Sequence, residues 1–266
     1  MSASGRPSVS LCAWAYNEEA IIDQFVRKTD ADLRRVSDDY QLIVVDDGST
    51  DKTLERLHAL EAQFPALRVA THRQNLGYGS CFRTTIGMAT KQVILWNTVD
   101  MFHDTAELHT LLSHLDRFDL VQGVRTDLDA NPWNRKLTTI VNYWLIRLLF
   151  AIPMSEFQNV KVFKRGLMDH IVLEADSGFV NPEIGIKAFY LGARIKEVEV
   201  TFHPRRGGES KGAGLPILWR TLRDVLRLWF RWVVLRRAPR AAVRHPIEAL
   251  PGRRWGRPEF LKGRSE

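Results

Sequence analysis

Short apolar segments alternate with amphipathic segments along the first half of the chain. Five of the apolar segments are rich in valine, isoleucine and leucine, and each is predicted to be a β-strand: 8–14, 41–47, 66–72, 91–96 and 118–124. Between them, apolar residues recur at helical spacing, as in TLERLHAL (53–60) and over 79–90. Strands that alternate with helices favour right-handed βαβ units and a mainly parallel sheet, so we predict an α/β fold.

The second half of the chain is less regular. It predicts helices over 134–150 and 183–193, and strands over 161–165 and 194–203. The apolar run 138–154 contains Arg147 and Pro153, so it falls short of the roughly 18 to 20 uncharged residues of a membrane-spanning helix. We expect a core or interfacial helix there, and the initial MSASGRPSVSL lacks the pattern of a signal peptide.

Polar residues follow the predicted strands at their carboxyl ends. They are Tyr16, Asn17 and Glu18 after the first strand, Asp46 and Asp47 after the second, Asn75 after the third, and Thr98 and Asp100 after the fourth. Because ligands of open α/β sheets bind beyond the carboxyl ends of the strands, these residues together predict a binding site along one edge.

Composition and charge narrow the class of protein. Hydrophobic residues make up 45% of the 266 residues and charged residues 26%, which is typical of a globular domain. Cys12 and Cys81 lie in apolar patterns, so we expect buried thiols, no disulfide framework and a reducing, cytoplasmic setting. The net charge of +7 arises mostly beyond residue 200, where arginines predict an anionic partner such as a phosphate ligand or a lipid surface. No basic motif with interleaved aromatic residues accompanies them, so nucleic acid is not expected.

Motifs in a fixed order carry a family resemblance. They are AYNEE (15–19), VVDDGSTDKT (44–53), NLGYG with Arg83 (75–83), VDMFHD (99–104), QGVR (122–125), NPEIGIKA (181–188) and RRGGESK (205–211). Together they resemble the family 2 inverting glycosyltransferases with the GT-A fold, which include dolichol-phosphate mannosyltransferase and polyprenyl-phosphate glycosyltransferases. The resemblance implies a catalytic domain over 1–212 that moves a sugar from a UDP- or GDP-linked donor with inversion.

The resemblance also implies where the donor nucleoside binds. By similarity, Tyr16 and Glu18 lie beside the nucleoside, and Asp46 accepts a hydrogen bond from the base. Asp47 and Asn75 are expected on the same side of the site. A local interpretation stays open for Asp47, since Asx turns before a helix use the same residue types.

Asp100 matches the last acid of the family's D-x-D motif, which implies a Mg²⁺ or Mn²⁺ ion at the diphosphate. Thr98 replaces the first acid and Phe102 stands where a glutamine often helps, so we expect a weakened metal site. One carboxylate can suffice, because substrate phosphates and waters complete the coordination shell. His103 and Asp104 are reserve ligands, although His103 is also explained by a hydrogen bond at a helix start. Trp14, where the family usually has proline, is a further departure.

Fixed cations are expected to neutralise the diphosphate. By similarity they are Arg83, Arg125, Arg135, Arg205 and Lys211. The segment from Arg205 through Ser210 and Lys211 is implied to close over the phosphates, with Gly207 and Gly208 giving it freedom. Each arginine taken singly is equally explained as a solvated surface charge.

The acceptor side of the site is less well defined. SEFQNVKVF (155–163) stands in place of the family's aspartate-containing acceptor segment, so Glu156 and Gln158 are its candidate residues. Glu183 is the candidate general base that a hydroxyl acceptor would need. A polyprenyl phosphate needs no base, because its oxygen is already anionic at neutral pH.

Residues 213–238 predict an amphipathic helix. Arg220, Arg223, Arg227 and Arg231 share one stripe, and Leu218, Leu222, Val225, Leu226, Trp229, Trp232 and Val233 fill the other side. Such a helix is expected to lie in the headgroup layer at the inner face of the cell membrane, as peripheral attachment. Alternatively, it packs on the catalytic domain with its arginines solvated. The tail, 239–266, is rich in Pro, Gly and Arg and is predicted to be poorly ordered.

Three functions are consistent with these features. The first is a polyprenyl-phosphate glycosyltransferase at the cytoplasmic membrane face. The second is a glycosyltransferase of the same fold with a saccharide, lipid or natural-product hydroxyl as acceptor. The third is a non-catalytic scaffold with a nucleotide-sugar fold, which only the missing acid at Thr98 favours.

Overall fold

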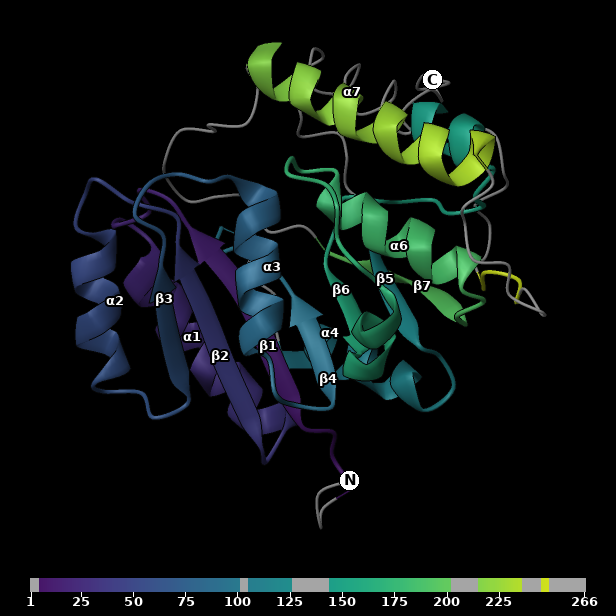
Figure 1. Ribbon diagram of the computed structural model, residues 1–266. Helices are drawn as coiled ribbons and strands as arrows, with labels where there is room; N and C mark the ends of the chain where they lie inside the picture. Colours follow the sequence, from purple (N-terminus) through teal and green to yellow (C-terminus); the bar gives the residue numbers. More distant parts are fainter. Residues whose placement is uncertain (1–4, 101–104, 126–143, 202–214, 236–244, 249–266) are drawn as a thin grey trace, which may run out of the picture.

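The computed structural model describes residues 5–100, 105–125, 144–201, 215–235 and 245–248. Within these ranges, seven strands form one sheet in the order β3-β2-β1-β4-β6-β5-β7 (Figure 1). The strands are β1 (Val9–Ala15), β2 (Tyr40–Asp46), β3 (Leu67–Thr71), β4 (Val93–Trp96), β5 (Leu120–Arg125), β6 (Lys161–Lys164) and β7 (Ile195–Val200). All run parallel except β6, which is antiparallel to both neighbours.

Helices cover both faces of the sheet (Figure 1). Those with described bounds are α1 (Ile22–Val36), α2 (Thr53–Glu61), α3 (Tyr78–Met88), α4 (Thr105–Ser113), α6 (Val180–Tyr190) and α7 (Leu215–Trp229). Buried side chains of α1, α2 and α4 pack into one apolar core, and those of α3, α6 and α7 into the other. Short 3-10 turns span His114–Asp116 and Arg165–His170, and a π-helical turn, Phe230–Val234, extends α7.

The α/β class and the seven predicted strands are confirmed, with boundaries that differ by a few residues. Strands such as β4 read as continuous apolar runs because they are buried on both faces. The position of β6 was not predictable from chain order, since it lies between β4 and β5 and reverses direction there. Of the helix predicted over 134–150, residues 144–150 are described and are helical.

One face of α7 packs on the rest of the protein and the opposite face is apolar and exposed. Val225 and Leu228 are buried in the core, and Trp232, just beyond α7, packs edge-on against Tyr190 of α6 at 5.9 Å between ring centroids. The prediction that Trp229 and Trp232 belong to a free apolar face is therefore wrong, because both lie against the body.

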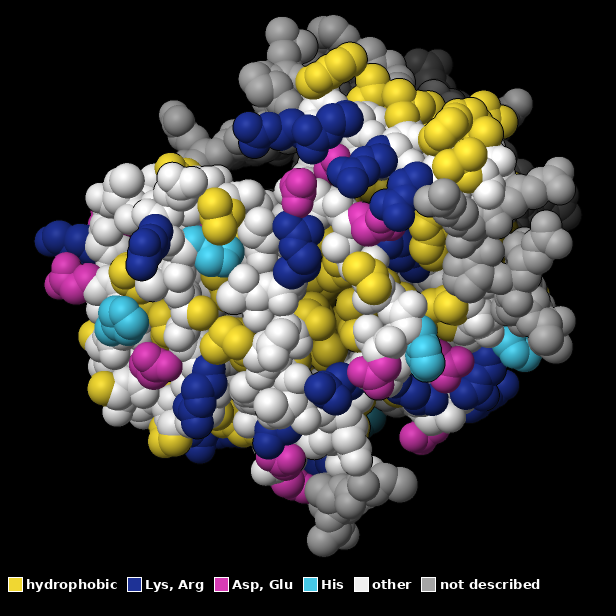
Figure 2. All heavy atoms as spheres, in the orientation of Figure 1, with side chains coloured by type: hydrophobic (Ala, Val, Ile, Leu, Met, Phe, Trp, Pro, Cys, Tyr) yellow, Lys and Arg dark blue, Asp and Glu magenta, His cyan; other side chains and the backbone are white. Residues whose placement is uncertain are grey.

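The exposed apolar face of α7 and its extension is made by other residues. They are Leu218, Trp219, Leu226, Phe230, Val234 and Leu235, and Trp219 is 69% exposed. Arg220, Arg223 and Arg227 are exposed beside them, and Figure 2 shows the hydrophobic side chains along α7 next to cationic ones. We call the six apolar residues the α7 ridge. None of the described helices is both long and apolar enough to cross a bilayer.

A short part of the predicted disordered tail is ordered. Glu248 donates its backbone N–H to the carbonyl of Ile195 and accepts from the N–H of Glu197, so it adds to the edge of β7. Ile247 is buried beside it. The other residues of the tail lie outside the described ranges.

Gly79 marks a close contact between α3 and the segment 174–177, which we call the 174–177 loop. A Cβ at Gly79 would lie 2.2 Å from the carbonyl oxygen of Ala175 and 2.7 Å from Cα of Asp176. Because both neighbours are backbone atoms, the loop must move to admit a side chain.

We predict that Gly79→Ala lowers the free energy of unfolding by about 1–3 kcal/mol, the usual effect of overpacking. Gly87→Ala is the matched control in the same helix, since a Cβ there meets no heavy atom within 4 Å. Its higher helix propensity should leave stability unchanged or raise it by up to about 1 kcal/mol. Urea denaturation of both variants measures the difference, and equal stabilities would contradict the contact.

Candidate active site

Hydrogen bonds join the loop after β1 to the loop after β2. The Asn17 N–H donates to Ser49 Oγ at 2.9 Å, and Asn17 Oδ1 accepts from the N–H of Thr50 at 2.7 Å. The Glu18 N–H donates to Thr53 Oγ1 at 2.8 Å. Asn17 adopts a positive φ of 53°, which asparagine tolerates better than most residues. The loop therefore sets Tyr16 and Glu18, both partly exposed, at the carboxyl edge near the end of β2.

Asp46, the last residue of β2, has one carboxylate oxygen in use and one without a partner. Oδ2 accepts from the Ser49 N–H at 3.1 Å and from Thr71 Oγ1 at 3.3 Å. Oδ1 is buried and has no hydrogen-bond partner among the described residues. An unsatisfied buried carboxylate oxygen is costly, so this position favours a hydrogen-bond donor supplied by a ligand.

Asp47, in contrast, is fully used by the protein. Its Oδ1 accepts from the Leu76 N–H at 3.0 Å and from His72 Nδ1 at 2.7 Å, and its Oδ2 accepts from the Gly77 N–H at 2.9 Å. The side chain is fully buried. Asp47 therefore shapes the loop after β3, and its predicted contact with the donor is not supported.

Asp47, His72 and Cys81 bring three possible metal-ligand atoms within 4.8 Å of one another. However, the ring of His72 already bridges Asp47 and Thr84, with Nε2 2.9 Å from Thr84 Oγ1. Burial and the nearby Asp47 raise the pKa of the Cys81 thiol, which keeps it protonated and a poor ligand. The arrangement is that of a structural hydrogen-bond cluster.

Arg83 is bound to the 174–177 loop. Its guanidinium donates to the carbonyl of Ala175 at 2.9 Å and to Asp176 Oδ1 at 2.7 Å. The side chain remains 37% exposed. In this conformation Arg83 supports the loop, so a contact with phosphate would require it to release Asp176. Asn75, by comparison, is exposed at the same edge.

Glu183 does not have the surroundings of a general base. It is fully buried in α6, and its two oxygens accept from the N–H groups of Glu174 at 2.8 Å and Ala175 at 2.9 Å. Lys187, one turn later, forms an ion pair with it at 2.5 Å. The carboxylate has no exposed oxygen for an acceptor, so the predicted catalytic role of Glu183 is not supported.

Two carboxylates that the sequence did not single out also organise this loop. Asp224 of α7 accepts from the N–H groups of Asp176 at 3.1 Å and Ser177 at 3.0 Å. Asp176 pairs with Arg83. No local pattern reveals such contacts, because the partners lie 48 and 93 residues apart in the chain.

The T-V-D motif follows β4, whose last residue, Trp96, belongs to a cluster of aromatic rings. Thr98 and Asp100 are partly exposed there. Tyr78 packs edge-on against Trp14 at 5.1 Å and against Trp96 at 5.8 Å between ring centroids, and burial raises its pKa to about 12. Trp14, near the end of β1 where the family usually has proline, therefore packs in this aromatic cluster.

Several predicted residues lie outside the described ranges: Phe102, His103, Asp104, Arg135, Arg205, Gly207, Gly208, Ser210 and Lys211. Arg125 is described only as the last backbone position of β5. On the acceptor side, Glu156 Oε1 accepts from the N–H groups of Phe157 at 2.9 Å and Gln158 at 3.0 Å, so it caps its own turn. Gln158 is exposed.

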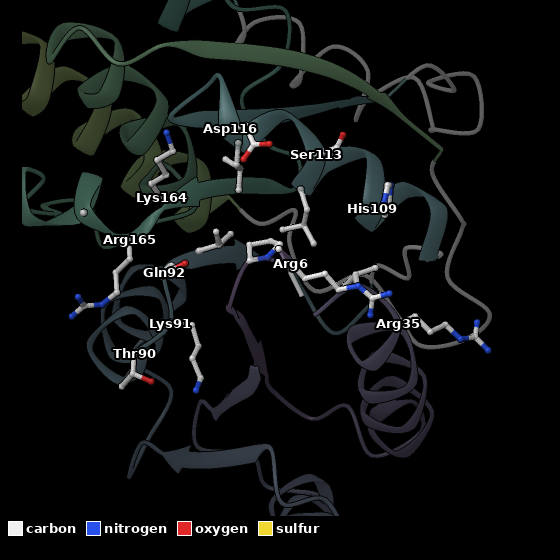
Figure 3. Close-up of a pocket in the computed structure, with 17 residues that line it drawn as sticks. Arg6, Arg35, Thr90, Lys91, Gln92, His109, Ser113, Asp116, Lys164 and Arg165 are labelled. Carbon is white, nitrogen blue, oxygen red and sulfur yellow. The ribbon is translucent and has the colours of Figure 1, made fainter. Parts of the chain in front are cut away.

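A cavity of about 750 Å³ lies at the opposite, amino edge of the sheet. It is lined by cationic residues, but Figure 3 shows that Arg35, Lys91, Lys164 and Arg165 point in different directions. Lys91 pairs with Asp39 and Lys164 with Asp119. Since these charges do not converge, the candidate site is the carboxyl edge.

Comparisons with known proteins identify the fold. Glucosyl-3-phosphoglycerate synthase from Mycobacterium tuberculosis, in complex with Mn²⁺, UDP and phosphoglyceric acid, is similar with a TM-score of 0.64 at 22% identity. The match covers 86% of this chain and 78% of that one. The same enzyme with Mg²⁺ and UDP gives a TM-score of 0.62 at 21% identity, over 86% and 79% of the two chains.

Similar sequences include an uncharacterized glycosyltransferase from Mycobacterium tuberculosis, 31% identical over 179 residues, which are 66% of this chain and 79% of that protein. Dodecaprenyl-phosphate galacturonate synthase from Rhizobium johnstonii is 25% identical over 84% of this chain and 66% of its own length. Undecaprenyl-phosphate 4-deoxy-4-formamido-L-arabinose transferase from Pseudomonas aeruginosa is 22% identical over 79% and 62%.

The profile of the family described as "Glycosyl transferase family 2" matches residues 10–168. That span contains the loops after β1, β2, β3 and β4 that build the carboxyl edge. The chain therefore belongs to glycosyl transferase family 2 and is a glycosyltransferase.

Proposed function

We propose that the protein transfers a sugar from a nucleoside-diphosphate sugar to a polyprenyl phosphate, with inversion, at the cytoplasmic face of the membrane. The observation that carries the donor half is Oδ1 of Asp46 at the carboxyl end of β2, which no described residue satisfies. The acceptor half rests on the prenyl-phosphate relatives and on the α7 ridge.

A pyrimidine or purine base would supply the hydrogen-bond donor for Asp46. An imide or amide N–H of the base can donate to Oδ1, with Tyr16 offering a face for stacking and Glu18 and Asn75 polar groups nearby. The solved relatives contain UDP, which makes a UDP-linked donor the first candidate.

Asp100 is the residue that would hold Mg²⁺ or Mn²⁺ against the diphosphate. Its partly exposed carboxylate suits either ion, and Thr98 can add a neutral oxygen ligand. The ion would neutralise the leaving diphosphate. Because one motif acid is missing, cationic side chains contribute more of the neutralising charge. The candidates are Arg125, Arg135, Arg205 and Lys211, with Ser210 as a hydrogen-bond donor.

A phosphate acceptor agrees with the lack of a base at Glu183. A prenyl phosphate oxygen is already anionic, so the protein must only position it in line with the anomeric carbon. We assign this positioning to the segment with Glu156 and Gln158. The hydroxyl acceptor is the second candidate, since one of the two solved relatives contains phosphoglyceric acid. It requires a base other than the buried, paired Glu183.

The α7 ridge supports attachment to a membrane surface. Trp219 and Phe230 are apolar and exposed, and Arg220 and Arg227 beside them can meet anionic headgroups. The inner face of α7 binds the 174–177 loop, which Arg83 of α3 also binds. A membrane that contacts the outer face of α7 would therefore bring lipid-borne acceptors close to the carboxyl edge.

The central test is transfer itself. The protein is incubated with labelled nucleotide sugars and a short polyprenyl phosphate, and label is measured in a butanol extract. Label in butanol with one donor supports the proposal. Transfer only to soluble hydroxyl acceptors would replace the acceptor assignment. Absence of label in butanol with every donor would overturn the proposed transfer to polyprenyl phosphate.

We predict that Asp46→Asn weakens UDP binding roughly 10- to 100-fold, since a hydrogen bond to a charged group is lost. The oxygen of the new amide can still accept from the Ser49 N–H. The NH₂ group of the amide would then face the N–H of the base, and two donors cannot form a hydrogen bond. Asp38→Asn is the control, because Asp38 is exposed, lies before the start of β2 and forms an ion pair with Arg6 away from the carboxyl edge. Isothermal titration calorimetry gives Kd for each, and an unchanged Kd in Asp46→Asn would exclude its contact with the base.

We predict that Asp100→Ala lowers kcat at least about 100-fold, because the diphosphate loses its motif carboxylate. Thr98→Asp should instead reduce the Mn²⁺ concentration that gives half-maximal activity, since it restores a second acid. Initial rates over a Mn²⁺ titration test both. Wild-type turnover by Asp100→Ala, or an unchanged titration for Thr98→Asp, would refute the respective assignment.

We predict that the double variant Trp219→Ser, Phe230→Ser reduces binding to vesicles containing anionic lipid by roughly 10-fold or more, because two exposed apolar side chains are lost. Val172→Ser is the control, since Val172 is 78% exposed but lies outside the ridge. Vesicle co-sedimentation measures the bound fraction. Equal binding by all three proteins would rule out the ridge as the contact.

A further inference from the structure

Lys161 is a fully buried lysine that the proposed reaction does not use. It is the first residue of β6, and its Nζ donates to the carbonyl of Phe157 at 2.8 Å and to Asn181 Oδ1 at 2.6 Å. These contacts join the strand, the preceding turn and helix α6. The lysine therefore ties together three elements on the acceptor side of the sheet.

Polar side chains surround this amine inside an otherwise apolar layer. Lys161 pairs with Trp96 of β4 on one side and with Gln122 of β5 on the other, so these side chains share one face of the sheet. Gln122, Asn159 and Asn181 are at most 1% exposed. Gln122 Oε1 and Asn159 Nδ2 have no hydrogen-bond partner among the described residues, so the protein does not fully satisfy this polar cluster.

The amine has no carboxylate in ion-pair contact within the described part of the chain. Trp96, Gln122 and Asn181 beside it are neutral. Glu156, in the turn before β6, acts on it only at longer range, and Glu197, in the same row on β7, is bound to the Ser155 N–H. Burial lowers the pKa of Lys161 to about 7, and Glu156 offsets part of that shift. An apolar side chain would avoid this cost, so packing alone does not explain a lysine here.

Its position relates the lysine to the reacting edge. Trp96 and Lys161 form the last pair of the antiparallel strands β4 and β6. Thr98 lies two residues after Trp96 and Asn159 two residues before Lys161, so both lie at the same edge of the sheet. The turn that Lys161 holds through Phe157 thus leads directly to Asn159. A shift of this turn would move Asn159 relative to the T-V-D motif.

We infer that Lys161 is a positioning residue for the acceptor: its buried amine fixes the 155–159 turn against α6 and so sets the place of Glu156 and Gln158 relative to Thr98. The inference deepens the proposed function and depends on it. Lys161 does not touch the substrate itself. We therefore expect loss of the amine to lower kcat/KM for the acceptor while leaving the Kd for the donor nucleotide unchanged.

The test compares Lys161→Met with Lys164→Met. Both remove a lysine from β6, but Lys164 pairs with Asp119 at the opposite edge. With a short polyprenyl phosphate as acceptor, Lys161→Met should lower kcat/KM for the acceptor roughly 10- to 100-fold, as expected for a misplaced reactant. Its Kd for UDP and its hydrolysis of the donor by water should change less than about twofold. Lys164→Met should behave as wild type.

Asn181→Leu removes the oxygen that accepts from Nζ and should reproduce the loss of acceptor kcat/KM expected for Lys161→Met, again with little change in Kd for UDP. Unchanged acceptor kinetics in Lys161→Met, or equal losses in UDP binding and transfer, would overturn the inference. If wild type itself bound UDP but transferred nothing to polyprenyl phosphate, the proposed function would fail instead.

A measurement of stability tests the buried contacts of Lys161 even if Lys161→Met is too inactive for kinetic measurements. The unfolded amine binds its proton up to the ordinary value of 10.5, whereas the folded one does so only below about 7. Unfolding therefore takes up a proton between these values, and the free energy of unfolding should rise with pH across that window. Lys161→Met should lack this contribution. Parallel pH profiles for both proteins would show that the amine is not desolvated in the folded protein, which would contradict the buried contacts that the inference requires.

Discussion

Buried carboxylates that accept backbone N–H groups hold the loops of the carboxyl edge. Asp47 accepts from Leu76 and Gly77, Glu183 from Glu174 and Ala175, and Asp224 from Asp176 and Ser177. Loops at this edge cannot pair in the sheet, yet their donors must be satisfied where they are buried. A carboxylate with two oxygens can serve two such donors at once. The form of the site depends on these contacts.

Asp46 stands apart from these carboxylates because one of its oxygens receives no hydrogen bond from the described part of the chain. Asp46 and Asp47 are adjacent in sequence and equally buried, yet both oxygens of Asp47 accept from the loop after β3, whereas Oδ1 of Asp46 has no partner in the described part of the chain. The difference follows from strand geometry, in which successive side chains point to opposite sides. Two adjacent acids therefore differ in how far the protein itself satisfies their oxygens.

The 174–177 loop connects α7 with α3. Asp224 on the inner face of α7 binds the loop, and Arg83 binds it from α3. The outer face of α7 carries the exposed apolar ridge. One helix thus combines a docked face with an exposed face, and the two alternatives drawn from its sequence are not exclusive.

The sequence by itself determined the order of strands and helices, the α/β class and the polar edge. Hydrophobic periodicity is local, and the family motifs keep their spacing, so Asp46, Thr98 and Asp100 were predictable as edge residues. Tertiary structure alone decided the roles of Asp47, Glu183, Arg83 and the tryptophans of α7. Their partners, including Asp176 and Asp224, are distant in the chain, and burial depends on how helices dock rather than on their own pattern. The same holds for Lys161, whose charge predicts a surface position until the fold encloses it.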